Sequence, residues 1–539
     1  MMRRWLCLGL LICSGGALAG TGDEPGGEAI FRRGILPDGR TLHGERTMGR
    51  GVDGTAAACV ACHRRSGLGM TEGRIVIPPI TGKYLFRPRA THVEYPSMPR
   101  GGAFLGMRVP YTESTLARAI RSGIDSSGRR LDELMPRFKL DDRAMAVLVD
   151  YLTRLSAGPM RGVTDDTLHF STIITPDADP VDGQAMLEVM QQFFSDKNSF
   201  IRGGSRAMKS SREVEYRVTR RWQLHVWELS GPPDTWGGQL RAKLAQQPVF
   251  AAISGLGGAT WEPVHEFCEQ AALPCLLPNV NLPKVAERDF YPVYFSRGLW
   301  LEADLFMQRL RTAQQAGTIR RIVQVYRPGD IGEPAAHALQ ISGLTAGLAV
   351  EMRALVPQRS SGVDLANAVA GLSPDDALVL WLRPPDLAVL PDIAPAARDL
   401  LVSGLMGDLE QAPLPPAWHQ AVMMSYPLDL PDLRRVRMNF PLGWLRIHKL
   451  APAARRVQTD TYVACGILAE ALGEMLDSFV PEYLLERTED MLSHRLTNGY
   501  YPRLTLGPGQ RFASKGGYLI HFTADAGEAI VADSAWMVP

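Results

Sequence analysis

One stretch of five residues holds the side chains best suited to chemistry. Residues 59–63 read Cys-Val-Ala-Cys-His, a C-x-x-C-H pattern in a chain with 7 cysteines and 11 histidines. Cys59 and Cys62 lie about one helical turn apart, so both thiols face the same side. Each could add to one vinyl group of a single porphyrin, while His63 binds the iron as proximal ligand. The spacing therefore predicts one covalently attached haem c.

Two other chemistries compete for the same stretch. A zinc site needs two more ligands at ligand spacing, and the sequence has no second C-x-x-C and no H-x₃₋₅-H. A thiol redox pair would follow an apolar strand, whereas residues 51–58 are rich in glycine and alanine. Covalent haem is the interpretation that the pattern favours.

Three helical patterns surround this motif and would position it. Residues 28–34 form a short pattern that ends at Gly34, and residues 114–121 form a second. Residues 141–155 form the strongest, with apolar side chains repeating at helical spacing. A helix-rich N-terminal domain is expected.

Residues 25–157 resemble a class I cytochrome c. The resemblance rests on the haem motif, on Pro78-Pro79, on Met135-Pro136 and on the last helix. It implies an all-α fold, an electron-transfer role, and Met135 as the sixth iron ligand, with Met98 as a rival because it stands in a second Met-Pro-Arg. It also implies that a proline carbonyl, assigned here to Pro79 with Pro78 as the alternative, accepts a hydrogen bond from the imidazole of His63.

The first 19 residues predict export. A positive start at residues 1–4 precedes nine apolar residues, and Ala17-Leu18-Ala19 is a small-x-small cleavage site. We expect a signal peptide at 1–19 and a periplasmic protein. No later run is apolar enough to span a membrane. The formal net charge of +1 gives no electrostatic reason to expect nucleic acid as a partner.

Residues 158–167 predict a linker, and strands and helices alternate beyond it. Apolar runs such as 170–175, 249–254, 322–326 and 378–382 alternate with helical patterns. This alternation predicts α/β structure with parallel sheets, and about 370 residues is too long for one sheet, so two lobes are expected. Residues 500–506 and 512–518 are expected to form a strand and a hairpin.

Residues 168–539 resemble a type I periplasmic substrate-binding protein of the branched-chain amino-acid class. The resemblance rests on the run 246–255, the helix after it, Leu273-Pro274-Cys275, and residues 290–332. It implies a two-lobed fold that binds a small carboxylate or alcohol-derived ligand in the cleft between its lobes. The ligand would meet the loop Gly257, Gly258, Ala259 and Thr260. A tight strand–helix turn without a ligand is the open alternative for this loop.

Two further residues could form a covalent link. Cys268 and Cys275 lie seven positions apart in a chain expected in an oxidising compartment, so a disulfide between them is expected. A dinucleotide site is rejected, because the loop at 255–260 ends in Thr260 where the fingerprint needs glycine or alanine.

Together these patterns predict an exported haem electron carrier fused to a ligand-binding module. It would serve a periplasmic dehydrogenase pathway through redox partner proteins. The alternative is a periplasmic ligand receptor, sensor or transport-associated binding protein, with the haem as a redox readout. We expect no enzyme, because no hydrolase, metalloprotease or P-loop motif is present and haem peroxidase activity is disfavoured.

Overall fold

The computed structural model divides the chain into two compact units, residues 1–158 and 159–539. It describes residues 26–46, 49–73, 75–87, 108–207, 220–284, 289–356, 361–475, 478–494, 497–507, 509–523 and 530–539. The predicted signal peptide and the rival Met98 lie outside these residues. The unit boundary falls at the start of the predicted linker, and the finer domain assignments stay predictions.

The first unit is built around two helices that pack on each other. Helix α1 packs against α5, and Ile30, Phe31, Met145 and Leu148 lie buried in the shared apolar core. Asp141 caps α5 by accepting a hydrogen bond from the Ala144 N–H. The helices of this unit are α1 (Gly26–Arg33), α2 (Val60–His63), α3 (Gly82–Leu85), α4 (Glu113–Ser122) and α5 (Asp142–Arg154).

The prediction that this unit is all-α is wrong, because it also contains short antiparallel strands. Gly44 pairs with Phe138, and a side chain at Gly44 would meet the Phe138 ring at 2.9 Å. Short segments next to glycines have too few residues to form helices but can pair across turns. The strands are β1 (His43–Glu45), β2 (Gly51–Asp53) and β5 (Arg137–Phe138) in one sheet, and β3 (Met70–Glu72) and β4 (Ile75–Ile77) in another.

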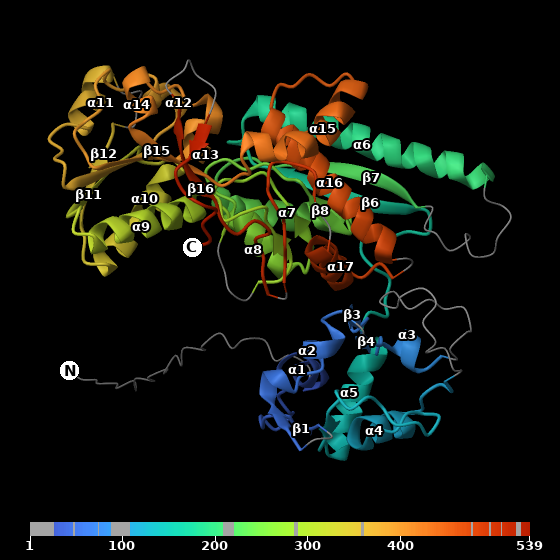
Figure 1. Cartoon of the computed structure of the whole chain (residues 1–539). Helices are drawn as coiled ribbons and strands as arrows, with labels where there is room; N and C mark the ends of the chain where they lie inside the picture. The colour runs from blue at the N-terminus through green and yellow to red at the C-terminus, as the bar shows by residue number, and fades with distance from the viewer. Residues whose placement is uncertain are drawn as a thin grey trace, which may run out of the picture. The chain divides into compact units, whose positions relative to one another are not determined.

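The second unit begins with a five-stranded, all-parallel sheet, coloured teal to green in Figure 1. Its strand order is β10-β9-β8-β6-β7. The strands are β6 (Thr167–Ile174), β7 (Arg221–Glu228), β8 (Ala251–Ile253), β9 (Cys275–Leu276) and β10 (Pro292–Val293). The connecting helices are α6 (Pro180–Ala207), α7 (Trp236–Gln246) and α8 (Glu262–Gln270), with the short η2 (Pro233–Thr235) before α7. We call this sheet and its helices lobe 1.

A seven-stranded sheet forms lobe 2, which is yellow to red in Figure 1. Its order is β12-β11-β13-β14-β15-β16-β17, parallel up to β15 and antiparallel after it. The strands are β11 (Arg321–Tyr326), β12 (Ala349–Ala354), β13 (Asp376–Trp381), β14 (Asp399–Val402), β15 (Val422–Tyr426), β16 (Tyr518–Phe522) and β17 (Ile530–Ala532). The helices are α9 (Leu299–Gln315), α10 (Gly332–Thr345), α11 (Gly362–Ala368), α12 (Pro384–Leu387), α13 (Gly404–Gly407), η3 (Leu409–Gln411) and α14 (Pro416–His419).

The chain passes between the lobes more than once. After β15 it forms α15 (Pro431–Ile447), α16 (Arg455–Met475) and α17 (Pro481–His494). Helix α16 packs against α6 and β8 of lobe 1 (Figure 1). The C-terminal segment then returns to lobe 2 as β16 and β17. The expected two-lobed α/β architecture is therefore present.

The C-terminal strands differ from the prediction. Residues 500–506 form no strand, and the antiparallel pair is β16 with β17. Pro502 lacks an N–H, and the Tyr500 carbonyl accepts a hydrogen bond from the Asp429 N–H, so this segment is held by loop contacts. Among the helices that the structure describes, none is both long and apolar enough to cross a membrane.

Candidate functional site

The C-x-x-C-H motif lies at the short helix α2. His63 is only 5% exposed, and its Nδ1 donates a hydrogen bond to the Pro78 carbonyl at 3.0 Å. The assignment of this contact to Pro79 is therefore corrected to Pro78. Burial lowers the pKa of His63 to about 4. The ring is neutral at physiological pH and carries its lone pair on Nε2.

The other residues assigned to this site are half-buried. Cys59 and Cys62 are free thiols, and burial raises the pKa of Cys59 to about 12, so this thiol stays protonated at neutral pH. Met135 is a partly buried side chain packed against the apolar core of the first unit. The assignment of these residues as binding residues stays a prediction.

The loop expected to bind a ligand carboxylate already has partners within the chain. The Gly258 N–H donates to Thr175 Oγ1 at 3.1 Å, and the Ala259 N–H donates to Asp177 Oδ2 at 2.6 Å. The other carboxylate oxygen, Asp177 Oδ1, accepts from the Thr175 hydroxyl at 2.6 Å. A carboxylate of the protein thus stands where the ligand's carboxylate was expected.

The rest of the loop is also satisfied internally. The Gly257 N–H donates to the Asn279 carbonyl at 3.3 Å, and Thr260 Oγ1 accepts from the Glu262 N–H at the start of α8. The loop forms a strand–helix turn closed by hydrogen bonds within the chain, and its assignment as a ligand-binding loop stays a prediction. Sequence reasoning missed Asp177, although it follows β6 at the carboxyl edge of the same parallel sheet as the loop.

A second group of charged and aromatic residues lies where the two lobes meet. Asp182 comes from the first turn of α6 in lobe 1, and Asp408 follows α13 in lobe 2. Helix α16 adds two residues one turn apart, and the segment after α17 adds two tyrosines. We call these six residues the interlobe cluster: Asp182, Asp408, Arg456, Asp460, Tyr500 and Tyr501.

Arg456 connects the cluster electrostatically. Burial raises the pKa of both Asp182 and Asp408, and the Arg456 charge opposes the shift in each case. The Asp408 charge itself raises the pKa of Asp182, so the acid of lobe 2 acts on the acid of lobe 1. Both groups are partly open to solvent. The charged groups of the two lobes therefore act on one another electrostatically at this position, which a dissolved molecule can reach.

Asp460 is the most deeply buried of the three acids in the cluster. It is 4% exposed, and burial raises its pKa to about 7, against the opposing charges of Arg456 and Arg434. Its Oδ1 has no hydrogen-bond partner among the described residues. Buried polar atoms nearly always have a partner, so an open carboxylate oxygen points to a missing partner.

Contacts with lobe 1 fix the position of α16. The hydroxyl of Ser254, just after β8, donates to Thr461 Oγ1 at 2.8 Å. The Asn279 amide donates to Ser254 Oγ at 3.1 Å and to Thr461 Oγ1 at 3.3 Å. The next residue after Asp460 is thus tied to the carboxyl ends of the lobe 1 strands. The polar residues in the first two turns of α16, among them Asp460 and Thr461, were the signal in the sequence.

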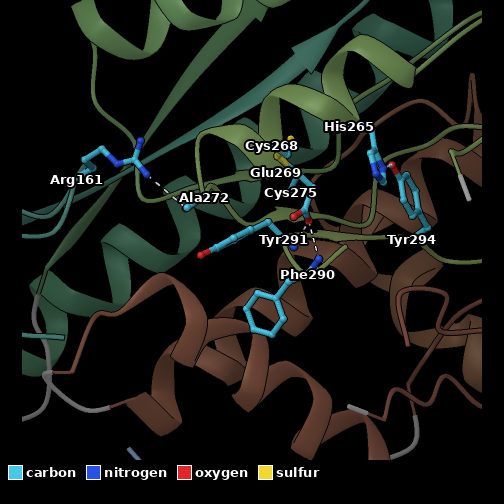
Figure 2. The surroundings of a disulfide bond; sticks show 9 residues. All are labelled: Arg161, His265, Cys268, Glu269, Ala272, Cys275, Phe290, Tyr291 and Tyr294. Atoms are coloured by element: carbon cyan, nitrogen blue, oxygen red, sulfur yellow. Dashed lines mark hydrogen bonds between the residues drawn. A yellow bond between two sulfur atoms is a disulfide. The ribbon is translucent and has the colours of Figure 1, made fainter. Parts of the chain in front are cut away.

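A disulfide stiffens the neighbouring part of lobe 1. Cys268 and Cys275 are bonded and join α8 to β9, with Glu269 beside them (Figure 2). The Glu269 carboxylate accepts hydrogen bonds from the N–H groups of Phe290 and Tyr291, both at 2.6 Å. This arrangement holds the chain that leads from β9 towards lobe 2.

The comparison with solved structures finds similar folds. A fatty acid ABC transporter substrate-binding protein from Thermomonospora curvata is 15% identical, with 71% of this chain and 95% of that chain covered and a TM-score of 0.49. A substrate-binding periplasmic protein from Ralstonia solanacearum is 14% identical, covering 68% and 100%, with a TM-score of 0.47. A leucine binding protein from Thermotoga maritima is 11% identical, covering 68% and 99%, with a TM-score of 0.46. No family model and no curated sequence matches the chain.

The functional prediction built on the first unit is corrected by these findings. The matched structures are named as substrate-binding proteins. Within the described residues, no group of three or more His, Cys, Asp or Glu side chains could hold a metal ion. Haem c, iron, metal binding and electron transport are not supported.

Proposed function

We propose that the chain is an exported periplasmic receptor that binds a small ligand between the lobes of its second unit. The proposal groups residues 168–539 with type I substrate-binding proteins. The observation that carries the proposal is the interlobe cluster, in which Asp182 of lobe 1 and Asp408 of lobe 2 share the field of Arg456. A ligand that contacts both sides would hold the lobes together.

The structure supports a binding role at this position for a second reason. Helix α16 is anchored to lobe 1 through Thr461, while Arg434 of α15 bonds to Tyr426 at the end of β15 in lobe 2. The segments that cross between the lobes therefore carry the cluster's central residues. Ligand contacts made there act directly on the relative position of the lobes.

Calorimetry of the full exported chain tests the proposal. The titrants are small acids, amino acids, alcohols and amines, and the variants are Asp408→Ala and a matched control, Asp234→Ala, on the exposed 3₁₀ helix η2 of lobe 1. We expect heat with at least one class and at least tenfold weaker binding in Asp408→Ala only. No heat with any class, or equal weakening by both variants, would contradict the proposal.

A further inference from the structure

The carboxylate of Asp460 lacks the counter-ion that its position offers. Arg456 lies one helical turn before it on α16, where an i,i+4 ion pair normally closes. No such pair forms, because Arg456 Nη2 instead donates to Asn281 Oδ1 at 3.0 Å. The Asp460 side chain therefore keeps an open Oδ1 although a cation stands on the same helix face.

The second cation near Asp460 is also engaged elsewhere. Arg434 Nη1 donates to the Asp429 carbonyl at 2.6 Å and to the Tyr426 hydroxyl at 2.5 Å, and its Nη2 binds Glu410. Its guanidinium also lies 4.6 Å from the centre of the Tyr500 ring. Neither arginine donates a hydrogen bond to Asp460, although the charges of both lower its pKa.

The charge of the interlobe cluster favours a cation. It contains three acids, Asp182, Asp408 and Asp460, and one base, Arg456, which gives a formal charge of −2 (1 − 3) when all are ionised. With Arg434, which also faces Asp460, the sum is still negative, at −1 (2 − 3). Asp460 is nine-tenths buried, so its charge is poorly screened by water. An arriving cation would supply the hydrogen-bond partner that the Asp460 carboxylate lacks.

The rest of the site argues against a ligand carboxylate. The amide groups of Gly258 and Ala259, which could bind an anion, are occupied by Thr175 and by the Asp177 carboxylate. A ligand carboxylate would have to displace Asp177 and would meet its charge. The ligand therefore needs a cationic group but no acidic one.

Two tyrosines supply apolar surface beside Asp460. Tyr501 stacks on Phe295 with ring centres 5.1 Å apart, which fixes its plane. The Asp460 charge acts on both Tyr500 and Tyr501. A short hydrocarbon chain next to the cationic group would pack on these rings.

We propose that the ligand is a small primary amine without a carboxylate, whose ammonium group donates a hydrogen bond to the open Oδ1 of Asp460. This rests on the proposed receptor function and names its ligand class. The groups that face Asp460 are Arg456 on its own helix, Arg434 on α15, and the two tyrosines. Both arginines that face Asp460 already donate hydrogen bonds to other side chains.

The test is calorimetry of the full chain with primary amines of one to six carbons. The carboxylic acid and the alcohol of each chain length serve as matched titrants. We expect binding by an amine, no binding by its acid, and at least tenfold weaker binding by its alcohol. Asp460→Asn should weaken amine binding at least tenfold, and the control Asp234→Asn should leave it unchanged.

A second measurement on the unaltered chain keeps the proposal testable if Asp460→Asn fails to fold. The ammonium binds the ionised carboxylate. As the pH is raised towards about 7, the affinity for the amine should therefore increase by up to tenfold per pH unit, and above pH 7 it should level off. A pH-independent affinity would overturn the proposal. Binding of acids or alcohols in preference to amines would also overturn it while leaving the receptor function intact, whereas absence of binding by any class would count against both.

Discussion

Replacing Asp460 with asparagine should change the stability of the unliganded chain by an amount that depends on pH. The free energy of unfolding of the variant minus that of the unaltered protein should be larger at pH 8 than at pH 4. The pKa of Asp460 rises from an ordinary 3.8 to about 7 in the folded chain because its carboxylate is buried. Between pH 4 and pH 7 the folded state therefore binds a proton that the unfolded state has lost. By linkage, the stability of the protein falls as pH rises through this window and stays low above it.

The magnitude follows from the size of the shift. About three pKa units at 1.36 kcal/mol each give roughly 4 kcal/mol of stability lost between pH 4 and pH 8. Asparagine has no charge to bury, so it lacks this loss. Its amide N–H groups meet the same surroundings at both pH values, and their cost cancels when the two pH values are compared.

Thermal unfolding followed by circular dichroism measures the difference. The second unit has 381 residues (539 − 158), and an unfolding entropy of about 2.1 cal/mol/K per residue gives roughly 0.8 kcal/mol/K. We expect the Tm of Asp460→Asn, relative to the unaltered chain, to be about 5 °C higher at pH 8 than at pH 4. If the two proteins show the same pH dependence of Tm, the carboxylate is not buried as an isolated charge and the reasoning fails.

Three other perturbations test separate parts of the structure. Replacing both Cys268 and Cys275 with serine should lower the free energy of unfolding by about 2.4 kcal/mol, from the loop-entropy rule for a seven-residue separation. The variant should unfold at a lower urea concentration than the unaltered protein, and a reducing agent should not lower its midpoint further. Gly258→Ala should destabilise lobe 1 by about 1–3 kcal/mol, because the new Cβ would lie 2.4 Å from the Asp177 carboxyl carbon; an unchanged urea midpoint would show that this loop is loose. Alkylation of the denatured, unreduced mature chain should modify the three cysteines outside the disulfide, Cys59, Cys62 and Cys465. An intact mass above that of the polypeptide, with only one thiol modified, would overturn the correction of the haem assignment.

The buried parallel strands could be predicted from the sequence because they are continuous apolar runs. Strands β11 and β13 each pair with a strand on both sides in the lobe 2 sheet, and their side chains are almost all buried. Strand β12 was missed because Glu351 and Arg353 interrupt its apolar pattern. It lies at the sheet edge, where Arg321 bonds Glu351 at 2.8 Å, so charged side chains are tolerated.

The interlobe cluster could not be predicted because its key property depends on distant residues. Asp460 and Arg456 are spaced as an ion pair, and a helix considered alone would close it. The pair stays open only because Asn281, 175 positions earlier, takes the Arg456 guanidinium. Likewise, the loop at 257–260 was expected to bind an anion. Its internal partner, Asp177, could not be recognised from the sequence because it lies 82 positions before Ala259.

These two arrangements explain each other. Asp177 already accepts a hydrogen bond from the loop that was expected to bind an anion, so a ligand carboxylate is not needed there. The Asp460 carboxylate has no partner, and its burial destabilises the unliganded state by several kcal/mol. A ligand ammonium would recover part of that cost on binding, so the affinity would come from relief of an existing penalty rather than from a large new contact area. Helix α16 is tied to lobe 1 one residue further on, at Thr461. Asp460 and Thr461 lie on the same helix. A ligand that stabilises the buried Asp460 carboxylate would therefore change how firmly α16 holds the two lobes, and this helix would link ligand binding to lobe movement.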